Sequence, residues 1–197
     1  MIPDLPAVPT PSPRSMPLRA ALMATLVALS ACTPRFDWRS VRGTDAPYTI
    51  LLPAKPSTHT RSVNLGGIQA SMTMTAAEVD DVTFAVGSAE LPDAAQAQAA
   101  LLVMKDTLVK NIGGVIRREK SMLGSQASTI ELEAGPAAPG LPVGASDVQA
   151  VRNARMTALH ARLLARGRRV YQVIVIGADK SIPQDAVDMF LTSFKLE

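Results

Sequence analysis

Histidine and cysteine, the side chains most often used for metal binding and proton transfer, are scarce in this chain of 197 residues. The two histidines, His59 and His160, lie far apart in the sequence, and the single cysteine is Cys32. A zinc site takes about four protein ligands, which this set does not supply. A surface or hydrogen-bonded position is the simplest expectation for His160. We therefore predict no metal site and no cofactor.

Nucleophile and phosphate-binding motifs are also missing from the sequence. Serine and threonine are plentiful, but none lies in a Gly-x-Ser-x-Gly elbow. Gly66-Gly67 is not a phosphate loop, because no Lys-Ser/Thr pair follows it. Glu78, Asp80 and Asp81 could bind Ca²⁺, but that ion takes six to eight oxygens, and a solvated hairpin turn explains the three acids more simply. These features predict a protein without catalytic activity.

The most distinctive charged feature is a set of arginines with no acidic residue between Asp147 and Asp179. The arginines can be solvated charges at a strand edge and a hairpin tip, where they deter strand addition. They can equally dock on an acidic surface, such as phospholipid headgroups, lipopolysaccharide phosphates or a protein partner. The set comprises Arg152, Arg155, Arg162, Arg166, Arg168 and Arg169. The predicted docking residues are Arg162, Arg166, Arg168 and Arg169.

The N-terminal segment has the organisation of a secretory signal. Arg14 and Arg19 precede an apolar run over residues 20–31 that is broken only by one threonine and one serine. As a helix this run would rise about 18 Å, short of the ~30 Å hydrocarbon core, so it should not span a bilayer. Residues 1–15 contain five prolines, and we expect translation to start at Met16 instead.

The end of this run, Leu29-Ser30-Ala31-Cys32, resembles the lipobox of bacterial lipoproteins, in which an aliphatic residue and two small residues precede a cysteine. The resemblance implies that Cys32 receives a diacylglyceryl group, that the peptide is cut before it, and that the new amine is acylated with a chain such as palmitate. Two or three acyl chains suffice for stable anchoring. Thr33 follows Cys32 where an aspartate would retain the protein in the inner membrane. By resemblance to that sorting rule, we expect the outer membrane, facing the periplasm.

The rest of the chain predicts a lipidated tether over residues 32–46 and a single domain over residues 47–197. The formal net charge of +3 and the 4% aromatic content argue against nucleic-acid binding. The hydrophobic share of 47% is enough to build a core. Trp38, the sole tryptophan, should pack onto the domain as a first short strand, because an exposed tryptophan would leave a large apolar area in water.

Apolar patterning predicts strands over residues 48–52, 59–65, 68–76, 82–86, 115–123, 128–134, 155–165 and 168–177. Turns are expected at Gly66-Gly67, at residues 78–81 and at Arg166-Gly167, where Gly167 can take positive φ. Residues 170–176 are almost continuously apolar, which is typical of a central strand covered on both faces. Residues 135–146 are rich in proline and glycine and predict an exposed loop.

Two helices are predicted. The longer one begins at Asp93, a suitable N-cap, and stops at Gly113, a suitable C-cap. Its apolar stripe comprises Ala97, Leu101, Met104, Leu108 and Ile112. The second helix covers residues 183–195. The fold class is therefore α+β, an antiparallel β-sheet with a long helix and a C-terminal helix packed on it.

Three segments resemble the PsbP-like fold. Residues 48–56 resemble its opening strand with a following Pro-x-x-Pro, and residues 161–173 resemble its long hairpin. Residues 183–194 resemble its closing helix, which ends in Phe-x-x-Ser-Phe. The resemblance covers roughly residues 47–196 and implies an α/β/α sandwich. Members include extrinsic photosystem subunits, a nuclear-import factor that binds a small GTPase, and bacterial envelope lipoproteins, so the resemblance implies partner binding rather than catalysis.

Two functions remain open. The first is a lipid-anchored, non-catalytic protein-interaction module that docks another envelope protein. The second is a carrier or sensor that holds a small ligand between sheet and helix, in a pocket lined by adaptable methionines. The candidate methionines are Met72, Met74, Met104 and Met122.

Overall fold

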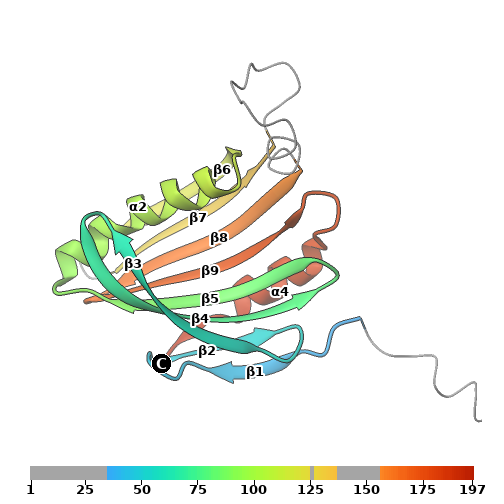
Figure 1. Cartoon of the computed structure of the whole chain (residues 1–197), viewed down its shortest axis with the longest axis horizontal. Coiled ribbons are helices and arrows are strands. Elements are labelled where there is room, and N and C mark those ends of the chain that lie inside the picture. Colours follow the sequence, from blue (N-terminus) through green and yellow to red (C-terminus); the bar gives the residue numbers. More distant parts are fainter. Residues whose placement is uncertain (1–34, 125–126, 137–155) are drawn as a thin grey trace, which may run out of the picture. The chain divides into compact units, whose positions relative to one another are not determined.

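A seven-stranded antiparallel sheet is the central element of the computed structural model, which describes residues 35–124, 127–136 and 156–197 (Figure 1). Its strands follow the order β3 (Ser57–Leu65), β4 (Ile68–Val79), β5 (Val82–Glu90), β9 (Arg169–Ala178), β8 (Thr157–Arg166), β7 (Ala127–Gly135) and β6 (Val115–Leu123). A smaller sheet joins β1 (Arg39–Arg42), β2 (Tyr48–Leu52) and β10 (Lys195–Leu196). With the two helices described below, the predicted α+β class with an antiparallel sheet is confirmed.

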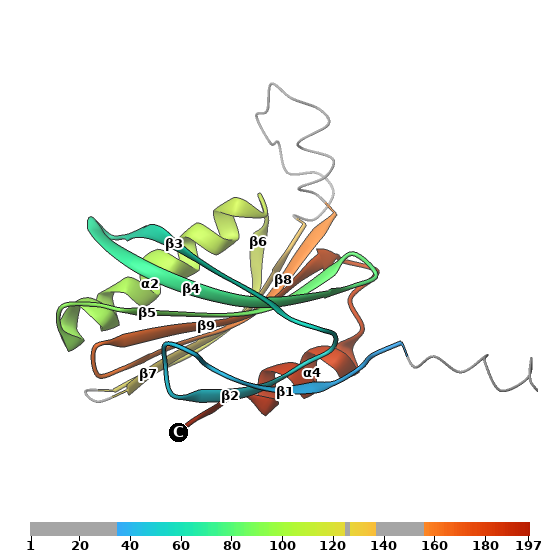
Figure 2. The same ribbon diagram turned by 60° about the horizontal axis from the view of Figure 1, so that its bottom comes forward.

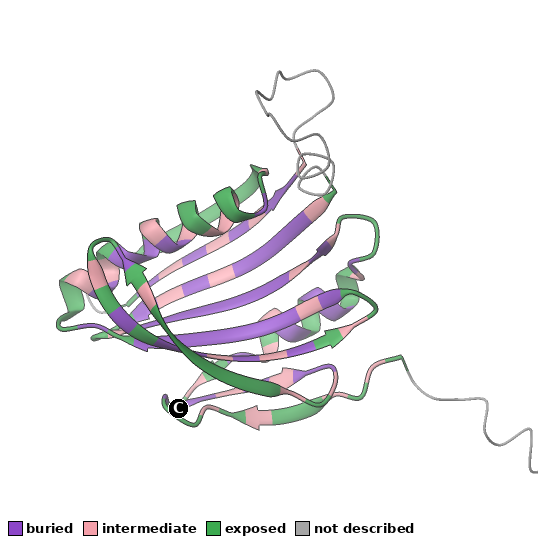
Figure 3. Ribbon diagram, viewed as in Figure 1, coloured by how far each residue is buried: buried purple, intermediate pink, exposed green. Residues whose placement is uncertain are grey.

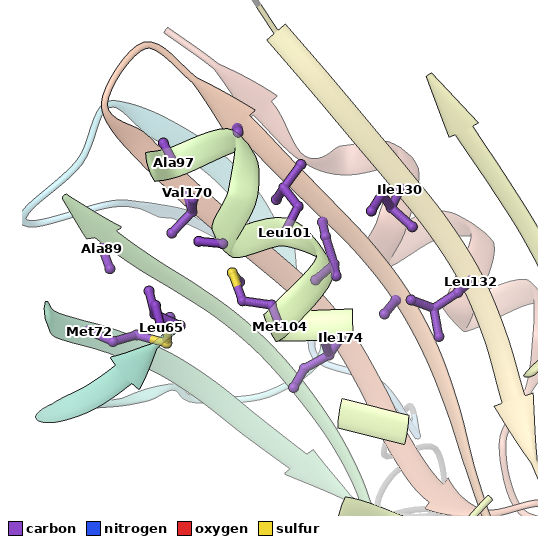
Figure 4. Close-up of a cluster of buried hydrophobic side chains, with 14 of the residues drawn as sticks. Leu65, Met72, Ala89, Ala97, Leu101, Met104, Ile130, Leu132, Val170 and Ile174 are labelled. Atoms are coloured by element: carbon purple, nitrogen blue, oxygen red, sulfur yellow. The ribbon is translucent and has the colours of Figure 1, made fainter. Parts of the chain in front are cut away.

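The long helix α2 (Ala94–Asn111) packs across β7, β8 and β9 on one face of the large sheet. Asp93 fixes its start, since the Asp93 carboxylate accepts a hydrogen bond from the Gln96 backbone N–H at 2.8 Å. Gly113, just beyond its end, takes the left-handed conformation with φ +58°. The predicted apolar stripe enters a buried cluster with side chains of the sheet, as Figure 4 shows for Leu101 and Met104 beside Ile174.

The opposite face of the sheet carries α4 (Gln184–Ser193) and the strands β1 and β2 (Figure 2). Phe190 of α4 is fully buried and meets Phe84 of β5 edge to face, with ring centroids 5.4 Å apart. Trp38 also packs on Phe84, at 6.4 Å, so the tryptophan does contact the domain, although it precedes β1 instead of lying in it. The compact unit begins at Phe36. Residues 36–46 therefore fold with the domain, because Phe36 and Trp38 bury aromatic area against it.

Tight turns connect the hairpins of the large sheet. Gly66 and Gly67 both have positive φ, as do Asp80 and Asp81 between β4 and β5. In the β8–β9 hairpin Arg166 pairs with Arg169, so the turn is Gly167-Arg168 and not the predicted Arg166-Gly167. The shift of one residue places Gly167, with φ +56°, at the first central position of the turn, where a left-handed backbone is needed.

Burial varies strongly across the large sheet. β9 lies in the middle of the strand order, and its residues 170–175 are all buried, as its continuous apolar sequence predicts. Figure 3 shows this buried centre together with the largely exposed β3 at one edge. β6, at the other edge, is exposed at every one of its 9 residues. The two edge strands therefore differ from the core strands in having no second sheet neighbour among the described residues.

Candidate functional site: the open face of β6, β7 and β8

The half of the large sheet formed by β6, β7 and β8 has one apolar face and one charged face. Side chains alternate along a strand, so Ile130 and Leu132 of β7 join the α2 cluster while Glu131 points to the opposite side. In β8, Leu159, Ala161 and Leu163 likewise face α2, and His160 and Arg162 lie on the opposite face. We call this charged side, with its β6 and β7 residues, the open face.

The open face carries two rows of alternating basic and acidic side chains that run across the strands. In the first row Lys120 of β6 stands opposite Glu131 of β7, which stands opposite Arg162 of β8. Arg162 Nη2 lies 2.7 Å from Glu131 Oε1. Each row thus places an acid between two basic side chains. The second row comprises Arg118, Glu133 and His160.

Helix α4 walls this surface and turns it into a groove of about 290 Å³. Gln184, Asp188 and Thr192 of α4 contribute to the lining. Arg162 joins the wall to the floor, because its Nη1 donates a hydrogen bond to the backbone carbonyl of Leu191 at 2.8 Å. The Thr192 hydroxyl donates to the Asp188 carbonyl at 2.6 Å. The groove is therefore lined by charged side chains, and hydrogen bonds hold Arg162 and Thr192 in place.

His160 lies at the base of this groove and is only 9% exposed. Desolvation by burial lowers the pKa of its imidazole, while nearby carboxylates, Glu133 first among them, partly oppose that effect. The imidazole is accordingly neutral at neutral pH. Within the described residues no cluster of three or more His, Cys, Asp or Glu side chains is arranged to hold a metal ion. The groove thus combines carboxylates, cations and a buried imidazole.

The structure separates the four predicted docking arginines. Arg162 lies in the groove, paired with Glu131, whereas the other three lie at the β8–β9 tip. Both Arg168 and Arg169 pair with Glu90 of β5, the latter at 2.7 Å. Arg166 is exposed, makes no ion pair within the described part of the chain, and borders a shallow pocket with Tyr171.

The acids that pair with these arginines could not be seen in the local sequence. Glu90 and Glu131 lie on β5 and β7, far from the hairpin in the chain, and the sheet brings them alongside. Two further arginines of the set, Arg152 and Arg155, lie outside the described residues, as do Cys32 with its lipobox and most of the predicted loop over residues 135–146.

The remaining candidates are dispersed. His59 lies on the exposed edge strand β3, and Asp80 and Asp81 form the β4–β5 turn that the simpler interpretation predicted. The four methionines are not gathered around one pocket. Met72 and Met104 are buried in the α2 cluster and Met74 packs against it, but Met122 lies on β6 and is 56% exposed.

The exposure of β6 is the feature that local sequence patterns did not reveal. Its large apolar residues lie at its two ends and are all exposed, namely Val115, Ile116, Met122 and Leu123. Leu123 also borders an open groove of about 400 Å³ beside Leu102 of α2, which is 53% exposed. The described part of the chain thus leaves these apolar side chains of the sheet edge in water.

Two of the four central charges of β6 are anchored to other elements. Arg117, at an irregularity in the β6–β7 register, makes a paired contact with Asp179 through Nη1 and Nη2 at 2.8 and 3.1 Å. This hydrogen bonding lowers the pKa of the Asp179 carboxyl. Glu119 pairs with Lys105 of α2 at 3.3 Å. Arg118 and Lys120 lie on the open face, where the 83% exposed Arg118 side chain is 3.9 Å from Glu133.

Comparisons with known proteins add no relative. No protein-family model matches the chain, and no curated protein matches it either. Within residues 35–124, 127–136 and 156–197, neither helix has the combination of length and hydropathy that a bilayer-spanning segment requires.

Proposed function

We propose that this chain is a lipid-anchored, non-catalytic interaction module of the bacterial cell envelope that docks another envelope protein through β6 and the open face. The observation that carries the proposal is an edge strand of 9 residues, exposed throughout, with four large apolar side chains in water. An exposed edge of this length invites pairing with another chain. Docking there needs no catalytic group.

The anchor in this proposal is Cys32 within Leu29-Ser30-Ala31-Cys32. Each acyl CH₂ buried in the membrane contributes roughly 0.8 kcal/mol, and two or three chains hold a protein at the surface without spanning it. The anchor would leave the folded unit from Phe36 onward in the periplasm, tethered at the outer membrane. A tethered domain meets membrane-bound partners at a raised effective concentration, so a modest interface suffices.

The tip arginines have a smaller part in this proposal than the sequence predicted. Glu90 offsets Arg168 and Arg169, and within residues 35–124, 127–136 and 156–197 no acid pairs with Arg166. Arg162 contributes differently, by holding Glu131 in the first charge row. The docking surface is therefore centred on β6 and not on the β8–β9 turn.

In-cell photocrosslinking tests this function. A photoreactive residue is placed at Met122 on β6, at Thr60 on β3 as the matched edge position, and at Arg166 on the tip. We expect one dominant protein adduct from position 122 and none from position 60. Lipid adducts alone, or no adducts from any of the three positions, would contradict a protein-docking module.

The anchor is tested separately with a Cys32→Ser variant. Cells labelled with an alkyne analogue of palmitate should yield a labelled wild-type protein and an unlabelled variant. Labelling of the variant at the wild-type level would refute lipidation at Cys32, whatever the crosslinks show.

A further inference from the structure

We infer that β6 accepts an extended segment of its partner as an eighth strand, and that this segment carries acidic residues at alternate positions, Asp/Glu-x-Asp/Glu. The inference rests on the proposed docking function and specifies the chemistry of the partner. It follows from the backbone at the edge, from the order of charges across the sheet and from the like-charge repulsion that opposes pairing of β6 with a second copy of itself.

The backbone of β6 offers the hydrogen bonds. β6 pairs with β7 on one side, and among the described residues it has no strand on the other. In an antiparallel ladder about half of the N–H and C=O groups of an edge strand point away from its neighbour. An extended segment that meets these groups gains main-chain hydrogen bonds, as in other cases of strand addition.

The charge rows specify the side chains. Read from β8 to β6, the first row runs Arg162, Glu131, Lys120 and the second runs His160, Glu133, Arg118. The next strand would place its residues about 4.5–5.5 Å from Lys120 and Arg118, where opposite charge stabilises the pair. Since Lys120 and Arg118 are two residues apart on one face, the matching acids must also be two apart.

The ion pairs within the protein leave Arg118 and Lys120 available to a partner. Glu131 is already held by Arg162 at 2.7 Å, and Glu133 lies 3.9 Å from an Arg118 side chain that is 83% exposed. Arg117 and Glu119, by contrast, are held by Asp179 and Lys105. The partner therefore meets two positive charges on the open face.

A second copy of this chain fits β6 poorly. In a symmetric antiparallel pair the residue on the two-fold axis faces its own copy. Registers that pair all or nearly all of β6 are centred on Arg118, Glu119 or Lys120, so each places like charges opposite one another. The register centred on Glu119 also sets Arg118 against Lys120. A different, acidic strand avoids these repulsions.

The test uses the full mature protein in detergent and three blocked, fluorescently labelled peptides. The first, Thr-Val-Glu-Val-Glu-Val-Thr, has alternate acids. The second, Thr-Val-Glu-Glu-Val-Val-Thr, has the same composition with adjacent acids, and the third, Thr-Val-Lys-Val-Lys-Val-Thr, has reversed charge. Fluorescence anisotropy should give the tightest binding for the first peptide. We expect roughly tenfold weaker binding for each of the others.

A matched pair of variants locates the site. Arg118→Glu with Lys120→Glu reverses the charges on β6 and should make the lysine peptide the preferred ligand. His59→Glu with Arg61→Glu places the same two acids, two residues apart, on the exposed edge strand β3, and should leave the preference unchanged. Circular dichroism of both variants checks that each is folded.

The outcomes separate the two proposals. Equal binding of the alternate-acid and adjacent-acid peptides would overturn the inference, as would an unchanged preference in the β6 variant. If no peptide binds while position 122 still crosslinks to one protein in cells, the strand-addition inference is wrong and the docking function stands. If no peptide binds and position 122 gives no protein crosslink, the strand-addition inference and the docking function are both wrong.

Discussion

The two edge strands of the large sheet, β3 and β6, are equally long and mostly exposed, yet they are built differently. Side chains of β3 are tied to its neighbour β4, since Thr58 bonds to Thr75 and Thr60 to Thr73, each at 3.0 Å. Its last residue, Leu65, is buried in the α2 cluster. In β6 the apolar residues stay in water and two cations point outward. Side chains of β3 are thus bonded to β4 and Leu65 is buried, whereas the large apolar side chains of β6 are all exposed.

The two faces of the neighbouring strands β7 and β8 also differ from each other. On the α2 side the strands β7 and β8 supply a mostly apolar layer, while on the open face they supply the charge rows. The first face belongs to the buried core, and the second is the face on which the proposed docking surface lies. The same strands can do both because side chains alternate.

Truncation of a buried side chain in the apolar layer should have the largest effect on stability. Its effect on peptide binding should differ between β7, beside β6, and β4, beside β3. Leu132→Ala on β7 and Met72→Ala on β4 each remove a buried side chain from the α2 cluster. Each should lower the free energy of unfolding by about 2–5 kcal/mol in urea titrations. Only Leu132→Ala should also weaken binding of the alternate-acid peptide, because β7 is the strand that pairs with β6. An equal loss of peptide binding in Met72→Ala, measured under conditions where both variants are folded, would contradict a binding site at β6.

Removal of the innermost cation of the first row should have a smaller effect. Arg162→Met leaves Glu131 without its partner at 2.7 Å and frees the Leu191 carbonyl. The free energy of unfolding should fall by about 1–2 kcal/mol, since both side chains are partly solvated. Glu131 would then turn to Lys120, so peptide binding should weaken severalfold. Tighter binding in Arg162→Met would show that the rows are not coupled.

The smallest expected effect is a pH dependence that distinguishes the two histidines. Because burial lowers the pKa of His160 in the folded state, the unfolded chain takes up this proton more readily. The corresponding stability is present above about pH 6.5, the ordinary value, and is lost as the pH falls below it. His160→Gln should flatten the decline in unfolding free energy between about pH 6.5 and 5. His59→Gln retains His160 and should keep the wild-type slope; the reverse result would contradict burial of His160.

Much of the fold could be predicted from the sequence because local patterns determine it. The continuous apolar run of β9 indicated a central strand, and the caps Asp93 and Gly113 set the bounds of α2. The site could not be predicted in the same way, because strand order is not a local property. The segment 115–123 was correctly predicted as a strand, but nothing in its sequence says that it lies at the edge. Glu90 and Glu131, which pair with the hairpin arginines, become neighbours of that hairpin only through the sheet.

Amide hydrogen exchange on the mature protein, with and without the alternate-acid peptide, tests the central claim that β6 is the partner-binding edge. The account predicts slower exchange over residues 115–123 when the peptide is bound and no change over residues 57–65. Protection over residues 57–65 or at the β8–β9 tip, with β6 unaffected, would contradict it.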